Sequence, residues 1–108
     1  MYSVLANINA VGIKTVQLDE NFQPKVDDIL TTADNNSKLL FICSPNNPTA
    51  NSFTSESILK LIKNFKGVVV IDEAYIDFSK EESWINKLNE FPNLMVTQTL
   101  SKAYGMAG

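Results

Sequence analysis

Residues 68–75 read Val-Val-Val-Ile-Asp-Glu-Ala-Tyr and are the clearest indication of the fold. Four consecutive β-branched apolar residues are typical of a strand buried inside a sheet. The run ends at the acidic Asp72, and the aromatic Tyr75 follows shortly after it. Ligands of open α/β sheets bind outside the carboxyl ends of the strands. The stretch therefore predicts a buried strand with a candidate binding site at its end.

Two further apolar runs also end in polar segments. Residues 38–43 predict a strand covered on both faces, and residues 94–97 predict the last strand. The segments that follow are Ser-Pro-Asn-Asn-Pro-Thr at 44–49 and Thr-Leu-Ser-Lys at 99–102. If the three strands are parallel, their polar segments gather at one edge of the sheet.

Helical patterns separate these strands. We expect helices over 1–11, after Pro24, after a Thr54 cap and over 84–91, together with a short strand at 13–18. The helix after Thr54 should bury an apolar face made of Ile58, Leu59, Ile62 and Phe65. Strands that alternate with helices predict an α/β fold, in which helices lie on both faces of a parallel sheet.

Composition excludes several classes of function. The chain has 108 residues and a net charge of -3, which argues against the basic surface of a nucleic-acid-binding protein. All nine basic residues are lysines, and the absence of histidine excludes imidazole catalysis within this chain. The single Cys43 excludes an internal disulfide and fits a reducing compartment. Residues 1–10 lack a signal-peptide pattern and no run is long enough to span a bilayer, so we expect a cytoplasmic protein.

Four side chains in the polar segments could bind one planar heterocycle. Asp72 could pair with a pyridinium nitrogen, Asn47 and Tyr75 could bind a ring oxygen, and Lys102 could supply a nucleophilic amine. Each has an ordinary alternative: a helix cap for Asp72, a turn for Asn47, core packing for Tyr75 and a solvated surface position for Lys102. Their order after successive strands favours the functional interpretation.

Two hydroxyls accompany the lysine. Thr99 and Ser101 lie just before an expected helix start, where backbone amides and hydroxyls commonly bind phosphate. An N-cap pair is the ordinary alternative.

In this order, the three polar segments resemble those of the fold-type I, class II aminotransferases, which depend on pyridoxal 5'-phosphate (PLP). Residues 72–78, Asp-Glu-Ala-Tyr-Ile-Asp-Phe, and 1–4, Met-Tyr-Ser-Val, are most similar to the subgroup that acts on histidinol phosphate. The resemblance runs the full length of the chain, and it implies that residues 1–108 are a central fragment of the large PLP-binding domain, with the small domain absent. Ala50 stands where this family commonly has glycine.

The resemblance also implies roles. Lys102 would link to PLP and move the substrate proton, Asp72 would hold the ring nitrogen, and Asn47 and Tyr75 would bind the ring oxygen. Thr99 and Ser101 would bind the phosphate, and no metal is implied. The reaction would transfer an amino group between histidinol phosphate and 2-oxoglutarate in histidine biosynthesis, in a homodimer that binds amino and keto acids, no nucleic acid and no membrane.

Three alternatives stay open at this point. A phospho-amino-acid decarboxylase similar to threonine-phosphate decarboxylase would carry nearly the same site residues. A nucleotide hydrolase is suggested by the apolar strand ending in Asp72-Glu73, although the chain has no glycine-rich phosphate loop ending in Gly-Lys-Ser/Thr. The isolated 108 residues could also be an inactive folded fragment of a larger enzyme.

Overall fold

A three-stranded parallel sheet lies at the centre of the computed structural model, which describes residues 1–106. Its strands, in the order β1-β2-β3, are Leu39–Cys43, Val68–Asp72 and Leu94–Thr97. All three confirm strands predicted from apolar runs. The register places Cys43 beside Asp72 and Asp72 beside Thr97, so the carboxyl ends of the strands meet at one edge.

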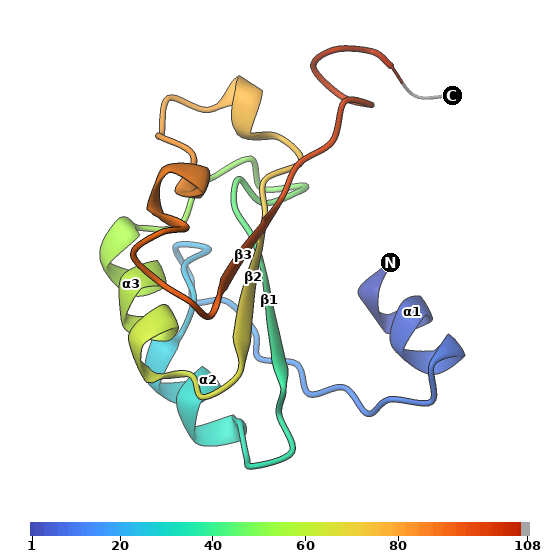
Figure 1. Ribbon diagram of the computed structural model, residues 1–108, viewed down its shortest axis with the longest axis vertical. Coiled ribbons are helices and arrows are strands. Elements are labelled where there is room, and N and C mark those ends of the chain that lie inside the picture. The colour runs from blue at the N-terminus through green and yellow to red at the C-terminus, as the bar shows by residue number, and fades with distance from the viewer. Residues whose placement is uncertain (107–108) are drawn as a thin grey trace.

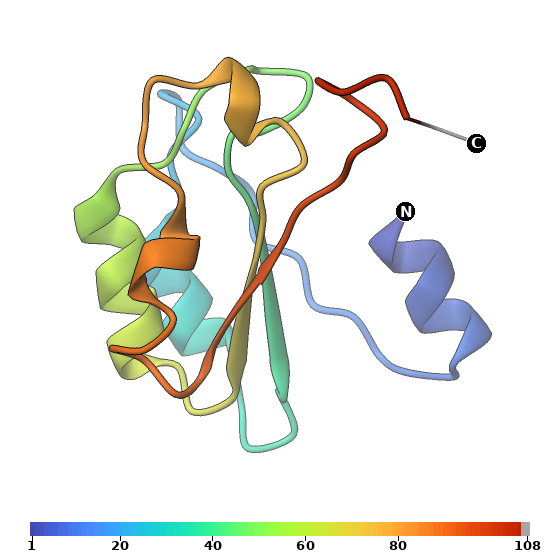
Figure 2. The ribbon, with the colours of Figure 1, turned by 45° about the horizontal axis from the view of Figure 1, so that its top comes forward.

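Helices lie on both sides of this sheet, which confirms the α/β prediction. Helices α2 (Val26–Thr32) and α3 (Ser55–Asn64) pack on one face (Figure 1). Helix α1 (Tyr2–Ile8) stands on the opposite side in both views (Figure 2) and has no buried residue. The hydrophobic core therefore lies between the sheet and the α2–α3 pair.

Helix α3 covers the middle of the sheet. Its predicted cap is confirmed, because Oγ1 of Thr54 accepts a hydrogen bond from the Ser57 amide at 3.3 Å. The buried face of α3 differs in one residue from the prediction: Leu61 is fully buried, whereas Leu59 is only partly buried. Other core residues include Ile42, Val69, Ile71, Trp84 and Leu94.

The predicted strand at 13–18 is wrong, because these residues form no strand. Val16 and Leu18 are half-buried while Thr15 and Gln17 are exposed, so the alternation of a strand is present. A strand needs a neighbouring strand to pair with, and within residues 1–106 β1 pairs only with β2. Of this segment, Leu18 packs against the core.

Two predicted helices are shorter than expected. Helix α1 ends at Ile8 rather than near Gly12, because Ala10 has a left-handed backbone with φ of 53°. The helix predicted over 84–91 is reduced to the 3-10 turn η2 (Trp84–Lys87), of which only Trp84 is buried. A second 3-10 turn, η1 (Ile76–Phe78), follows β2.

The face of the sheet opposite α3 is only partly covered within the described residues, contrary to the prediction of a first strand covered on both faces: α1 contacts it through the Tyr2 ring on Phe41. Leu39 is 57% exposed and Phe41 is 44% exposed. The side chains of Leu39 and Phe41 lie on this face, whereas the side chain of the next residue, Ile42, points to the core. No helix within residues 1–106 is long and apolar enough to cross a membrane.

Candidate active site

The polar segments after the three strands meet at the edge where the strands end. Three of the predicted residues, Asn47, Asp72 and Tyr75, line one cavity of about 330 Å³. The other lining residues are Met1, Tyr2, Cys43, Pro45 and Ala74. The parallel register explains this convergence, because it brings the loop after β1 beside the loop after β2.

The Asp72 carboxylate is held from two sides. Its Oδ2 accepts a hydrogen bond from the phenol of Tyr2, and its Oδ1 accepts one from the Ala74 amide at 3.0 Å. The Tyr2 ring stacks on Phe41 with ring centroids 4.5 Å apart. A carboxylate has about four lone-pair sites, so acceptor capacity remains for a further donor from the cavity. Apart from the opening motif, no sequence pattern indicated that Tyr2 reaches Asp72.

Two neighbours of Asp72 hold their protons firmly. Burial, together with the hydrogen bond to Asp72, raises the pKa of the Tyr2 phenol above its ordinary value. Burial, and then the Asp72 charge, raises the pKa of the Cys43 thiol, which lies 4.0 Å from the Tyr2 oxygen. Both groups therefore stay neutral near pH 7, and Tyr2 remains a donor toward the carboxylate.

A second group of predicted residues surrounds the Tyr75 side chain. Nδ2 of Asn47 lies 3.4 Å from the Tyr75 hydroxyl, so an amide donor and a phenol are adjacent. The Nζ atom of Lys102 lies 5.5 Å from the centre of the Tyr75 ring, within the range of a cation–π contact. Tyr75 thus connects the cavity to the segment that carries the lysine.

Thr99, Ser101 and Lys102 do not line the cavity itself. The two hydroxyls lie 2.7 Å apart, and the Ser101 amide donates to Oγ1 of Thr99 at 3.2 Å. No helix follows them within the residues described, up to 106, so the expected helix start is not present there. Lys102 is exposed.

Sequence reasoning missed the role of Glu73, which is 1% exposed. The alternation of β2 contains a signal that could have found it, because Val69 and Ile71 point into the core and residue 73 follows in the same phase. Asp72 and Glu73 therefore turn to opposite sides. One carboxyl group lines the cavity and the other lies in the core.

A second cavity of about 320 Å³ contains none of the predicted site residues. Its lining residues are Ser44, Ser52, Phe53, Ser55, Ile76, Glu81, Glu82, Ser83, Trp84, Asn86, Lys87 and Glu90. Within residues 1–106, no three or more His, Cys, Asp or Glu side chains are grouped to hold a metal ion. The convergence of Asn47, Asp72 and Tyr75 distinguishes the first cavity as the candidate site.

Comparison with protein families identifies the origin of this arrangement. The family model described as aminotransferase class I and II matches residues 1–108. The chain belongs to this family. Among solved structures, this aminotransferase segment is similar to the histidinol-phosphate aminotransferase of Clostridium acetobutylicum, with a TM-score of 0.87 and 26% identity over 97% of the chain and 32% of that structure.

Curated relatives are similar over the whole length of this aminotransferase segment. The histidinol-phosphate aminotransferases of Flavobacterium johnsoniae and Flavobacterium psychrophilum are 63% and 60% identical over all 108 residues. The segment spans 31% of the length of each of these two relatives.

Proposed function

We propose that this chain is the central part of the large domain of a PLP-dependent aminotransferase that exchanges an amino group between histidinol phosphate and 2-oxoglutarate. The observation that carries the proposal is the single cavity lined by Asn47, Asp72 and Tyr75, with the Lys102 amine over the Tyr75 ring. The names and high identity of the relatives support this substrate pair.

The residues present fit the cofactor. A carboxylate suits a protonated ring nitrogen, and adjacent amide and phenol groups suit a ring oxygen. Asp72 supplies the first of these, and Asn47 with Tyr75 supplies the second. The cavity, at about 330 Å³, lies at the lower end of the range of small-molecule sites. Bound there, PLP would supply an electron-withdrawing ring that stabilises negative charge on the substrate α-carbon.

The side chains of this chain would then have separate roles. Lys102 would hold the cofactor covalently until the substrate amine displaces it, and its free Nζ would carry the proton from and to the substrate carbon. Tyr2 would keep the Asp72 carboxylate oriented toward the cavity. The paired hydroxyls of Thr99 and Ser101 would donate to the cofactor phosphate. The resemblance further supports a cytoplasmic homodimer as the form of the full-length protein.

The decisive experiment traps the lysine. The full-length protein is incubated with PLP, reduced with borohydride, digested and mapped by mass spectrometry. We expect the modification on Lys102, and we expect Lys102→Arg to lose it while keeping the positive charge. Lys66→Arg, at an exposed lysine beyond the end of α3, is the matched control and should stay modified at Lys102. Modification of another lysine would contradict the assignment.

The reaction itself needs a separate assay. Purified full-length enzyme receives histidinol phosphate and 2-oxoglutarate, and glutamate formation is followed alongside carbon dioxide release. We expect glutamate without carbon dioxide. Release of carbon dioxide from a phospho-amino acid would favour the decarboxylase instead.

A further inference from the structure

The buried carboxyl group of Glu73, just after the end of β2, is hydrogen-bonded to two other segments of the chain. Oε1 accepts a hydrogen bond from the Trp84 amide at 2.6 Å. Oε2 accepts one from Oγ of Ser83 at 2.5 Å and another from Nε2 of Gln98 at 3.0 Å. Nε2 of Gln98 also donates to Oγ of Ser83 at 3.2 Å, so the side chains of Glu73, Ser83 and Gln98 all contact one another. Every oxygen of this 1%-exposed side chain is thus occupied by donors of the chain.

These contacts lie between the two segments that carry Asp72 and Lys102 in the proposed site. Glu73 directly follows Asp72, and its own amide donates to the Thr97 carbonyl at 2.8 Å. Gln98 directly precedes Thr99, the first residue of the segment that carries Lys102. The backbone bond and the side-chain bond together tie the end of β2 to the exit of β3.

We propose that Glu73 is a positioning residue, which fixes the direction in which residues 99–106 leave β3 and so places the Lys102 amine relative to Asp72 and Tyr75. The inference rests on the proposed function, because it assigns Lys102 its role. Glu73 reaches none of the reacting atoms and acts through Gln98. A displacement of about 1 Å in a catalytic group can cost on the order of a hundredfold in rate.

The test exchanges the side chains of Glu73 and Gln98. Glu73→Gln replaces the oxygen that accepts from Oγ of Ser83 and Nε2 of Gln98 with an amide donor. The Ser83 hydroxyl can rotate to accept from this amide, whereas Nε2 of Gln98 loses its charged acceptor. Adding Gln98→Glu restores a donor–acceptor pair with the same total charge. Hydrogen exchange of residues 99–106 is measured in the cofactor-free full-length protein, and kcat and KM are measured with PLP. Asn93→Ala is the matched control, because Asn93 bonds the carbonyls of Ile62 and Gly67 at the opposite end of the sheet.

We expect about tenfold faster exchange at 99–106 in Glu73→Gln, the scale of one lost hydrogen bond. We also expect kcat to fall on the order of tenfold with KM changed less than about twofold, and the double variant to recover most of both losses. Asn93→Ala should lower thermal stability and leave both measurements at wild-type values.

Wild-type exchange at 99–106 in a folded Glu73→Gln protein would overturn the proposal, as would a double variant no better than the single one. If Glu73→Gln does not fold, Gln98→Ala removes only one donor and is measured in the same way, with unchanged exchange counting against the proposal. If the wild type shows no lysine-linked PLP, the proposed function fails, whereas the exchange data still decide whether Glu73 anchors the segment.

Discussion

The phenol of Tyr2 donates a hydrogen bond to Oδ2 of Asp72, although the two residues are 70 positions apart in the sequence. Helix α1 buries no residue, and its first-turn tyrosine nevertheless contacts the edge of the sheet where the predicted site lies. The contact gives this otherwise peripheral helix a direct connection to the candidate active site.

Tyr2→Phe should change the response of the protein to alkaline pH. The folded state raises the pKa of Tyr2 above its ordinary 10.0, so the stabilisation is complete below pH 10 and is lost as the pH rises further. The wild type should therefore lose stability above pH 10 more steeply than Tyr2→Phe in denaturant titrations. Tyr104→Phe, at a phenol that is 62% exposed, is the control, and an equal slope in Tyr2→Phe and wild type would contradict the expectation.

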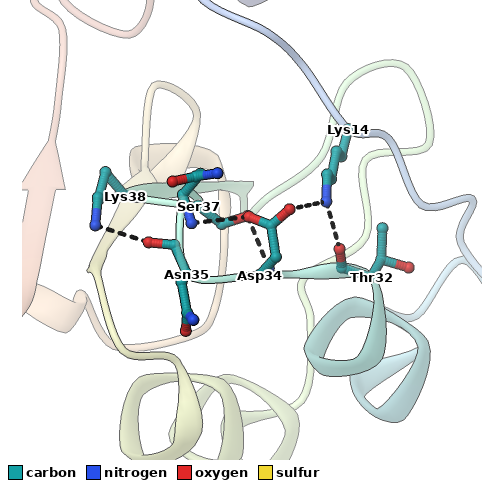
Figure 3. A network of polar contacts seen from close by, with 7 residues as sticks. Lys14, Thr32, Asp34, Asn35, Ser37 and Lys38 are labelled. Carbon is teal, nitrogen blue, oxygen red and sulfur yellow. Dashed lines mark hydrogen bonds and ion pairs between the residues drawn. The ribbon is translucent and has the colours of Figure 1, made fainter.

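Lys14→Gln should raise the pKa of Asp34. Nζ of Lys14 lies 2.6 Å from Oδ2 of Asp34 and also donates to the Thr32 carbonyl (Figure 3). This contact, followed by the Asn36 amide, lowers the pKa of Asp34 from 3.8 to about 2. The stability it contributes is present above pH 3.8 and is lost as the pH falls toward 2.

Carbon-detected NMR titration of the Asp34 carboxyl group checks this prediction. Lys38→Gln is the matched control, because Nζ of Lys38 donates to the Asn35 carbonyl at 2.8 Å in the same turn (Figure 3). The control should leave the pKa of Asp34 unchanged. An unshifted pKa in Lys14→Gln would show that the Asn36 amide and the Ser37 hydroxyl hold the carboxylate without Lys14.

Gly67→Ala should destabilise the fold by about 1–3 kcal/mol, because a methyl group there overpacks a site bounded by backbone. An added Cβ would lie 2.2 Å from the carbonyl oxygen of Lys38, next to the start of β1. Gly12→Ala is the control, since nothing lies within 4 Å of its added Cβ. Thermal unfolding of both variants measures the difference, and similar melting temperatures would argue against the close approach at Gly67.

Ala50→Gly should stabilise the protein by about 0.5–1 kcal/mol, since relief of left-handed strain exceeds the entropy cost of glycine. Ala50 has φ of 59° in the loop after β1, at the position where the resemblance suggested glycine. Ala33→Gly, at φ of -67°, should be destabilising instead. Chemical denaturation compares the two, and a loss of stability in both would contradict the strain at Ala50.

The sequence predicted the elements whose pattern depends on local burial. Three apolar runs became the three strands, and the Thr54 cap began helix α3 where expected. The gathering of Asn47, Asp72 and Tyr75 could be predicted because parallel strands bring their carboxyl ends together. Their roles toward PLP stay predictions.

The elements and contacts that were not predicted depend on residues far away in the sequence, which a local pattern does not contain. Residues 13–18 alternate like a strand, yet no strand in the described part of the chain pairs with them. The 84–91 pattern looked helical, but the amides of Asn86, Leu88 and Glu90 bond carbonyls three residues back, and only a short 3-10 turn forms beside the contact of Trp84 with Glu73. The contact between Tyr2 and Asp72 was unpredictable for the same reason.

Asp72 and Glu73 are adjacent carboxyl groups that face opposite sides of one strand end. Inserting or deleting a single residue within Val68–Asp72 would exchange their sides, and no point substitution could restore both at once. A library of one-residue insertions should therefore contain no active members with changes in β2, while the exposed residues Lys80 to Glu82 should accept them. The spacing of this short strand constrains how the protein can diverge.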